Sequence, residues 1–292
     1  MNEQNCPGRV GVVCNDAGGA EVVSSYIKRS TLDCMYCLSG PAIEIFRKKL
    51  GFVDNVSLKQ CLNNIDWLLC SMGWSDHEWE ALTKAKEMGK QTVVFLDHWT
   101  GYVNRFMRDG MTQLPDEVWV GDLYAKEIAL KVLPHTPIKF VPNPYYADLM
   151  DELELLSRKR KSRHEGINIL YVCEPTAPLA DLAKSSGYTE HEALRYFLEY
   201  LKNIDEEINS IIIRPHPTET IDKYSWVLED NFFFITMSDT NSLMEDVVNS
   251  DWVVGRNSMA LVIGLLAGKR SISCIPPGGK PCSLPQKEIL HF

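Results

Sequence analysis

The sequence of 292 residues contains no run of 18 or more apolar residues, so a membrane-spanning helix is excluded. The first residues, Met1 to Arg9, are polar, and we therefore expect no signal peptide. Basic residues are few as well: 30 lysines and arginines stand against 39 aspartates and glutamates, which gives a formal net charge of −9. Non-specific binding to nucleic acid needs a basic surface, so this class of function is disfavoured.

Signatures of cofactor and metal sites are also missing. The turn Asn15-Asp16-Ala17-Gly18-Gly19-Ala20 after the first apolar run is not the G-x-G-x-x-G fingerprint of dinucleotide sites. No Asp-x-Asp metal motif stands in a suitable loop. Cys34 and Cys37 have the spacing of a metal or redox pair, but they stand alone and a zinc site needs four ligands. We predict neither a cofactor nor a metal.

The nine cysteines are scattered rather than clustered. Cys14, Cys70, Cys173 and Cys274 lie in apolar, strand-like runs. Buried thiols without a disulfide framework are typical of a cytosolic protein, so we expect a cytoplasmic location.

Short, continuous apolar runs alternate with helical patterns along the first half of the chain, as in parallel βα folds. The expected strands are Val10–Cys14, Met35–Leu38, Trp67–Ser71, Thr92–Leu96, Val118–Val120 and Lys139–Val141, and the expected helices are Glu21–Lys28, Ala42–Leu50, Asp76–Met88 and Leu123–Val132. Gly89 is placed to close the third of these helices.

The alternation restarts after a polar segment, residues 151–166, which contains Arg158-Lys159-Arg160-Lys161. The expected strands of the second half are Ile167–Cys173, Ile211–Ile213, Phe232–Ile235, Trp252–Val254 and Ser271–Ile275, and the expected helices are Glu190–Asn203, Asn241–Asn249 and Met259–Ala267. The pattern predicts an α/β protein with two Rossmann-like domains, 1–150 and 167–292, joined by a linker at 151–166. Their mainly parallel sheets are expected to face a cleft.

Two polar segments follow apolar runs in the second half. Arg214-Pro215-His216-Pro217 offers a cation and an imidazole, and Asn257-Ser258 stands at the start of an expected helix, whose free N–H groups attract anions. Both lie where parallel strands end, the edge at which open α/β sheets bind ligands. Glu174 follows the first strand of this half and could cap a helix or bind a ribose. We predict a phosphate or diphosphate site here, although a lone histidine is more often structural.

Polar side chains also follow strands in the first half. Asp97 and His98 come directly after a strand and are candidates for a general base; alternatively, Asp97 caps the next helix. The turn with Asp16, Gly18 and Gly19 either contacts a ligand or is a plain strand-to-helix turn. Trp74 could stack on a sugar or base, although packing at the sheet edge is the commoner role of such a residue.

The second-half motifs carry a family resemblance. Arg-Pro-His-Pro after a strand, followed by Asn257-Ser258-Met259-Ala260, resembles the C-terminal domain of GT-B-fold glycosyltransferases. It is most similar to bacterial sialyltransferases and capsule glycosyltransferases with an "HP" motif and a serine motif. The resemblance covers about residues 167–275 in layout and implies that His216, Pro217 and Ser258 contact the phosphate of a CMP-linked donor. The acidic motif that supplies the base in those families is not evident, and Asp97-His98 is the nearest substitute by position.

The resemblance implies a metal-independent glycosyltransferase that uses a CMP- or UDP-linked sugar in bacterial surface polysaccharide or glycan biosynthesis. Its expected partners are the nucleotide sugar and a glycan or small-molecule acceptor. Two alternatives remain open: a nucleotide-sugar epimerase or hydrolase on the same fold, since UDP-sugar 2-epimerases have a similar serine-helix motif, or a non-catalytic nucleotide-sugar-binding subunit.

Overall fold

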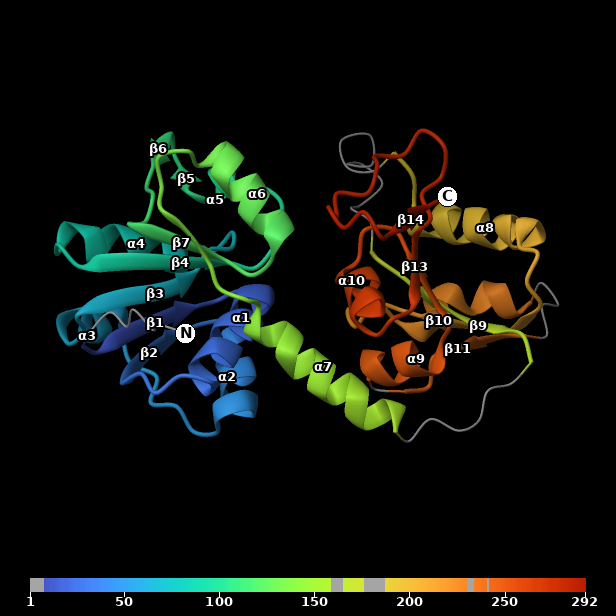
Figure 1. Cartoon of the computed structure of the whole chain (residues 1–292), viewed down its shortest axis with the longest axis horizontal. Coiled ribbons are helices and arrows are strands. Elements are labelled where there is room, and N and C mark those ends of the chain that lie inside the picture. The colour runs from blue at the N-terminus through green and yellow to red at the C-terminus, as the bar shows by residue number, and fades with distance from the viewer. Residues whose placement is uncertain (1–7, 159–164, 176–186, 230–233, 241) are drawn as a thin grey trace. The chain divides into compact units, whose positions relative to one another are not determined.

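The computed structural model describes residues 8–158, 165–175, 187–229, 234–240 and 242–292. The chain forms two compact units, Met1–Asp148 and Leu149–Phe292, each with its own six-stranded sheet (Figure 1). All strand pairs within the two sheets are parallel. The predicted α/β class with two Rossmann-like domains is therefore confirmed.

The sheet of the first unit has the order β2-β1-β3-β4-β7-β8. Its strands are β1 (Val10–Cys14), β2 (Cys34–Leu38), β3 (Trp67–Ser71), β4 (Gln91–Leu96), β7 (Glu117–Val120) and β8 (Ile138–Phe140). The helices are α1 (Ala17–Lys28), α2 (Ala42–Leu50), α3 (Leu58–Asn63), α4 (Asp76–Glu87), α5 (Tyr102–Arg105) and α6 (Leu123–Val132). The direction of chain progression reverses between β1 and β3, which makes the edge between these strands the topological switch point.

Both faces of this sheet are buried, which explains its continuous apolar strands. Successive side chains of a strand point to opposite faces. Val10 and Val12 of β1 belong to one core with Phe46 and side chains of α1, while α4 contacts β1, β3 and β4. Helix ends follow the local sequence: the Asp122 carboxylate caps α6 by accepting from Ala125 N at 2.7 Å, and Gly89, with φ +69°, follows α4.

The sheet of the second unit has the order β11-β10-β9-β12-β13-β14. Its strands are β9 (Ile167–Val172), β10 (Ile208–Arg214), β11 (Ile235–Met237), β12 (Trp252–Gly255), β13 (Arg270–Ser273) and β14 (Leu290–His291). The helices are α8 (Glu190–Tyr200), α9 (Leu243–Asn249) and α10 (Met259–Leu266), with 3₁₀ segments η2 (Leu201–Asn203) and η3 (Ile221–Leu228). Numbered within the unit, the order is 3-2-1-4-5-6, that of dinucleotide-binding Rossmann folds, with its switch point between β9 and β12.

The core of the second unit lies between its sheet and the segments α8 and η3. Tyr171 stacks on Phe197 with ring centroids 4.8 Å apart, and Tyr224 is fully buried beside them. Helix α10 contacts β12 and β13. It is apolar throughout, as expected for a helix with little exposed surface.

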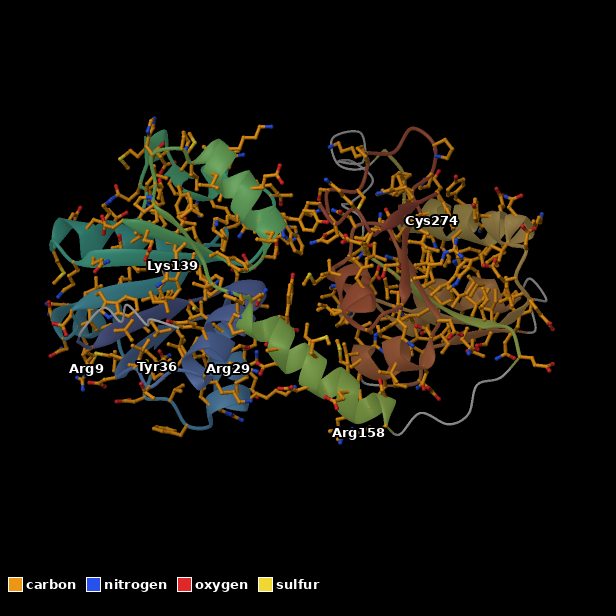
Figure 2. All side chains as sticks on the ribbon, in the orientation of Figure 1. Arg9, Arg29, Tyr36, Lys139, Arg158 and Cys274 are labelled. Atoms are coloured by element: carbon orange, nitrogen blue, oxygen red, sulfur yellow. The ribbon has the colours of Figure 1, made fainter. Side chains whose placement is uncertain are left out.

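The segment expected to link the domains begins inside a helix. Helix α7 (Pro144–Ser157) contains the boundary between the two units, and residues 159–164, with most of the basic run, lie outside the described residues. Asp148 joins this helix to the first unit, because its carboxylate pairs with Lys49 at 3.3 Å and with Arg29, which is labelled in Figure 2, at 2.6 Å.

Some elements differ from the sequence-based expectation. The strand expected at Phe232–Ile235 lies partly outside the described residues, and β11 begins at Ile235. The pattern did not predict α3, α5, β14 or the hairpin of β5 (Met107–Arg108) and β6 (Met111–Thr112). Asp109-Gly110, with φ +50° and +77°, is a hairpin turn signal that could have located the last of these.

The cysteine environments agree with the prediction of buried, reduced thiols. All eight cysteines in the described ranges are free, and Cys14, Cys70, Cys173 and Cys274, the last of which is labelled in Figure 2, are buried. Burial raises the pKa of Cys14 to about 12, so its thiol stays protonated at neutral pH. No helix in the described part of the chain combines the length and apolar character that spanning a bilayer needs.

Candidate functional site

The candidate residues lie at the carboxyl edges of the two sheets, in loops at each switch point or after a strand next to it. In the first unit, the Asp16 carboxylate follows β1 and reaches the loop after β3. It accepts hydrogen bonds from Trp74 N at 2.8 Å and Asn15 Nδ2 at 2.7 Å. Gly73 makes this possible, since a Cβ there would lie 1.5 Å from Asp16 Oδ2.

Glu78 is a second, fully buried carboxylate at this switch point, and sequence reasoning missed it. From the first turn of α4 it accepts hydrogen bonds from Asn15 N at 2.9 Å, Ser71 Oγ at 2.7 Å and Ser75 Oγ. These bonds join the loop after β1 to the loop after β3. Ser75 is the N-cap residue of α4, but its hydroxyl bonds to Glu78 rather than to a backbone N–H.

Asp97 lies at the end of β4, between an arginine and a glycine. Its Oδ1 pairs with Arg105 Nη1 at 3.1 Å, and a Cβ on Gly18 would lie 2.3 Å from its Oδ2. Gly18 therefore leaves room for the carboxylate at the start of α1, where the helix dipole favours negative charge. Asp97 does not cap α5, the next helix, whose N-cap residue is Gly101. Gly19 similarly leaves room for Ser71.

His98 has different surroundings from its neighbour. Its Nδ1 lies 3.2 Å from Thr100 Oγ1, and its ring is tilted against Trp99 with centroids 5.2 Å apart. Burial lowers the pKa of His98 below its ordinary value of 6.5. The imidazole is thus neutral at pH 7 and can accept a proton.

The side chains of Trp74 and Arg105 lie next to each other at the same edge of the sheet. Arg105 is buried and donates to Met72 O at 2.8 Å, while its guanidinium lies 5.6 Å from the centre of the Trp74 ring. Trp74 is nevertheless 60% exposed. The expected packing at the sheet edge therefore covers only part of this residue.

In the second unit, Glu174 joins the two loops at the switch point. Its Oε1 accepts from Arg256 N at 2.7 Å and from Asn257 N at 2.9 Å. These two amides belong to the loop before α10, whose N-cap residue is Ser258, so Glu174 holds this loop without capping the helix. Two N–H groups of the predicted phosphate site therefore already donate hydrogen bonds to a carboxylate.

Asn257 and Ser258 have defined structural partners. The Ser258 hydroxyl caps α10 by accepting from Ala260 N at 3.1 Å. The Asn257 side chain accepts from Ser283 N at 2.8 Å and donates to Ser283 Oγ at 3.0 Å. The segment after β13 therefore packs on this loop, a contact that nothing in the local sequence indicated.

Arg214 is held in a buried ion pair. Its Nη1 lies 2.6 Å from Asp246 Oδ2, and the same carboxylate oxygen accepts from Ser238 Oγ at 2.6 Å. Asp246 is on α9, so the pair joins β10 to that helix. This pairing is a sufficient structural reason for an arginine here, and its contact with phosphate stays a prediction.

His216 is partly exposed on a turn that Glu219 fixes. Glu219 Oε2 accepts from His216 N at 3.2 Å, and Thr218 N donates to His216 Nδ1 at 3.3 Å. Thr218 Oγ1 also lies 2.8 Å from His216 Nδ1. In the tautomer in which Nδ1 accepts, the ring carries its proton on Nε2, which has no partner among the described residues and can donate. Pro217, exposed beside it, holds the turn.

The structure thus brings some predicted residues together. Asp16 with Trp74, and Asp97 with Gly18, form one cluster in the first unit; Glu174 and Asn257 form another in the second. No hydrogen bond in the described ranges joins His216 to Ser258, because β9 separates β10 from β12. Two strand spacings amount to about 10 Å.

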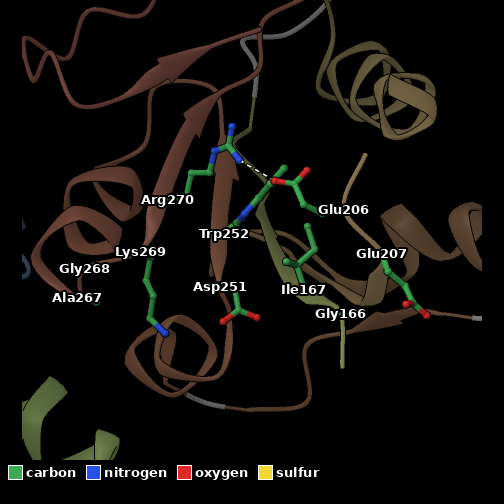
Figure 3. Close-up of a pocket in the computed structure, with 10 residues that line it drawn as sticks. All are labelled: Gly166, Ile167, Glu206, Glu207, Asp251, Trp252, Ala267, Gly268, Lys269 and Arg270. Carbon is green, nitrogen blue, oxygen red and sulfur yellow. Dashed lines mark hydrogen bonds and ion pairs between the residues drawn. The ribbon is translucent and has the colours of Figure 1, made fainter. Parts of the chain in front are cut away.

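A cavity of about 740 Å³ lies at the opposite edge of the second sheet. Ile167, Trp252 and Arg270, the first residues of β9, β12 and β13, line it (Figure 3). Arg270 pairs with Glu206 at 3.1 Å across this cavity. No predicted site residue contributes to it. Among the described residues, no group of three or more His, Cys, Asp or Glu side chains could hold a metal ion.

No protein-family model matches the sequence, and no curated protein matches it. Solved structures resemble it in fold. UDP-GlcNAc 2-epimerase from Methanocaldococcus jannaschii is similar with a TM-score of 0.61 and 10% identity, over 91% of this chain and 83% of that one. The glycotransferase of kitacinnamycin gives 0.54 and 9%, over 94% and 82%. MurG from Acinetobacter baumannii gives 0.53 and 11%, over 93% and 80%.

At these identities the likeness shows the fold alone. The chain has a GT-B-like fold, as the motifs of its second half had indicated, with two Rossmann-like units in succession. Fold does not fix the reaction, so the activity must be argued from the polar loops described above.

Proposed function

We propose that this chain is a GT-B-type glycosyltransferase that uses a nucleotide-activated sugar, CMP- or UDP-linked, to build a surface polysaccharide or glycan. The observation that carries the proposal is the second unit's switch point. There a sheet in the dinucleotide-binding order presents Glu174, Asn257 and the start of α10 together. Ligands of such sheets bind outside the carboxyl ends of the strands at this point.

The donor's phosphate is proposed to lie beside His216 and Ser258. His216 Nε2–H donates to a phosphate oxygen, and the N-terminus of α10 adds its dipole and the Ser258 hydroxyl proton. Glu174 repels a phosphate placed directly over the Arg256 and Asn257 amides, so it faces the ribose hydroxyls instead. When the sugar leaves, negative charge grows on the phosphate, and these fixed donors stabilise it.

The acceptor is proposed to bind the first unit, with Asp97 as general base. Asp97 takes the proton of the acceptor hydroxyl while that oxygen bonds to the anomeric carbon. The bond between this carbon and the donor phosphate breaks, and the phosphate oxygen keeps the electron pair. The ion pair with Arg105 and the space that Gly18 leaves at the start of α1 hold the Asp97 carboxylate in position.

The test is incubation with CMP- and UDP-sugars, with and without an oligosaccharide acceptor mixture, followed by product analysis. A sugar joined to an acceptor supports the proposal. Binding of nucleotide sugars without turnover instead identifies a non-catalytic subunit, and absence of binding overturns the proposal. The proposed independence of metal is tested in the same assay with a chelator, which should leave the rate unchanged.

A second candidate is a nucleotide-sugar epimerase or hydrolase. It is supported by the likeness to a UDP-GlcNAc 2-epimerase, at a TM-score of 0.61. The assay without acceptor separates these reactions, since free sugar indicates hydrolysis and an altered sugar still bound to its nucleotide indicates epimerisation.

We place the reaction in the cytoplasm because free, buried thiols suit a reducing compartment.

A further inference from the structure

Several contacts hold the exposed indole of Trp74 in place. Gly101, with φ +68°, lies beside the ring, and a Cβ there would come within 3.2 Å of Trp74 Cζ2 and Cη2. The guanidinium of Arg105 lies over the ring at 5.6 Å, and the backbone N–H of Trp74 donates to Asp16. We call Trp74, Gly101 and Arg105 the Trp74 seat. A ring held in place while 60% of its residue stays exposed is suited to contact a ligand.

The charge around the Trp74 seat is predominantly negative. Five carboxylates stand in the loops after β1, β3, β4 and β7 or at the start of the helix that follows: Asp16, Asp76, Glu78, Asp97 and Asp122. Against these stand two guanidinium groups, Arg105, which pairs with Asp97, and Arg108, which pairs with Asp76 at 3.2 Å. His98 adds no charge at pH 7. An anionic ligand is therefore repelled, whereas carboxylate oxygens accept hydrogen bonds from hydroxyl groups.

We propose that the Trp74 seat binds the ring of an uncharged hexopyranose, which lays its C–H face on the indole and donates hydroxyls to Asp16 and Asp97. This inference rests on the proposed function, because it names the class of acceptor that would meet the general base. The proposal excludes uronic acids, sialic acids and phosphorylated sugars as ligands of this seat, because they are anionic.

The test uses the full chain and sugars without a nucleotide. Lactose, cellobiose and methyl β-D-galactopyranoside serve as uncharged probes, and methyl β-D-glucuronide serves as the anionic probe. Saturation-transfer NMR and tryptophan fluorescence report binding. We expect an uncharged probe to bind with its ring C–H protons nearest the protein, and the glucuronide to bind at least about tenfold more weakly.

Three variants assign the binding to the seat. Trp74→Ala should weaken the uncharged probe about tenfold, the size of one aromatic contact, and Trp74→Phe should retain part of the binding. Phe52→Ala is the matched control, because Phe52 is an aromatic side chain that is 91% exposed elsewhere in the same unit, and it should change nothing.

Calorimetry with CMP and UDP separates this inference from the proposed function. If Trp74→Ala abolishes nucleotide binding instead, or if no uncharged probe binds the wild type, the inference is overturned while transferase activity can stand. If a probe binds through Trp74 but no nucleotide sugar binds or reacts, the proposed function fails and the sugar seat stands.

Discussion

Asp97 and His98 are adjacent in the chain, yet their surroundings suit them to different chemistry. Asp97 is held by Arg105 and Gly18, whereas His98 is half-buried beside Thr100 and Trp99. We favour Asp97 as the base, because an ionised carboxylate is available over a wide pH range.

Replacing the two candidate bases separately should identify the one that acts. Asp97→Asn should lower the transfer rate by about 10²–10⁴-fold, the usual cost of losing a general base, with donor binding unchanged. His98→Ala should leave the rate within a few-fold. Steady-state kinetics with calorimetric donor binding would check both. A variant of His98 that alone is inactive would show that the imidazole is the base.

The buried environment of His98 also predicts a pH dependence of stability. Its pKa is lowered in the folded chain, so between that value and 6.5 the unfolded chain binds more protons. The stability due to the neutral imidazole is therefore complete above pH 6.5 and decreases as pH falls below it. Urea unfolding of wild type and His98→Gln at about pH 7.5 and about pH 5.5 measures this. The wild type should lose more stability than the variant on acidification.

His216 is predicted to contribute to nucleotide affinity without contributing to the core. Its side chain is partly exposed, and Nε2 has no partner in the described ranges, so His216→Ala should leave the fold intact. Loss of a hydrogen bond to a charged phosphate should weaken CMP or UDP binding by about 1–3 kcal/mol. Calorimetry measures the change, with exposed His291→Ala as control. Unchanged affinity in a folded variant would falsify this role.

At the scale of elements, one glutamate at each switch point ties two loops together. Glu78 joins the loops after β1 and β3, and Glu174 joins those after β9 and β12. The two residues belong to different units, and each accepts hydrogen bonds from backbone N–H groups of a loop distant in sequence. The positions of the polar side chains at these edges depend on these hydrogen bonds.

Removing the tie in the first unit should cost stability. Glu78→Ala leaves Asn15 N, Ser71 Oγ and Ser75 Oγ without their acceptor, so the free energy of unfolding should fall by about 2–4 kcal/mol. Glu80→Ala is the matched control on the same helix, since the ion pair of Glu80 among the described residues is an exposed one, with Lys84. Chemical denaturation measures both. Equal losses in the two variants would contradict the buried tie.

At the scale of the whole molecule, each unit has a core of its own. Phe46 is fully buried in the first core and Phe197 in the second. Domains with separate cores can unfold separately.

Truncating either phenylalanine should therefore affect one unit. Phe197→Ala should cost about 3–5 kcal/mol in the second unit, and Phe46→Ala the same in the first. Hydrogen exchange with peptide resolution would locate the loss: faster exchange in β9 and β10 for one variant, and in β1 and β3 for the other. Faster exchange in both sheets of one variant would show that the units unfold together.

The sequence by itself determined the α/β class, most strands and helices, and the edge at which polar residues gather. Strands that are buried on both faces of a parallel sheet have short, continuous apolar runs in their sequence. Such runs can be recognised without knowing any tertiary contact. The GT-B-like fold indicated by the motifs is likewise confirmed, whereas the closer resemblance to "HP"-motif sialyltransferases and the roles of individual residues stay predictions.

Only the tertiary structure decided which side chains meet. The strand order makes the loops after β1 and β3 neighbours, and those after β9 and β12. The Glu174 carboxylate meets the amide of Asn257 83 positions away, and Arg214 meets Asp246 32 positions away. Long-range packing determines these partners, and the local sequence pattern does not indicate them. For this reason the sequence located the loops of the candidate site but could not separate residues that hold the fold from residues that face a ligand.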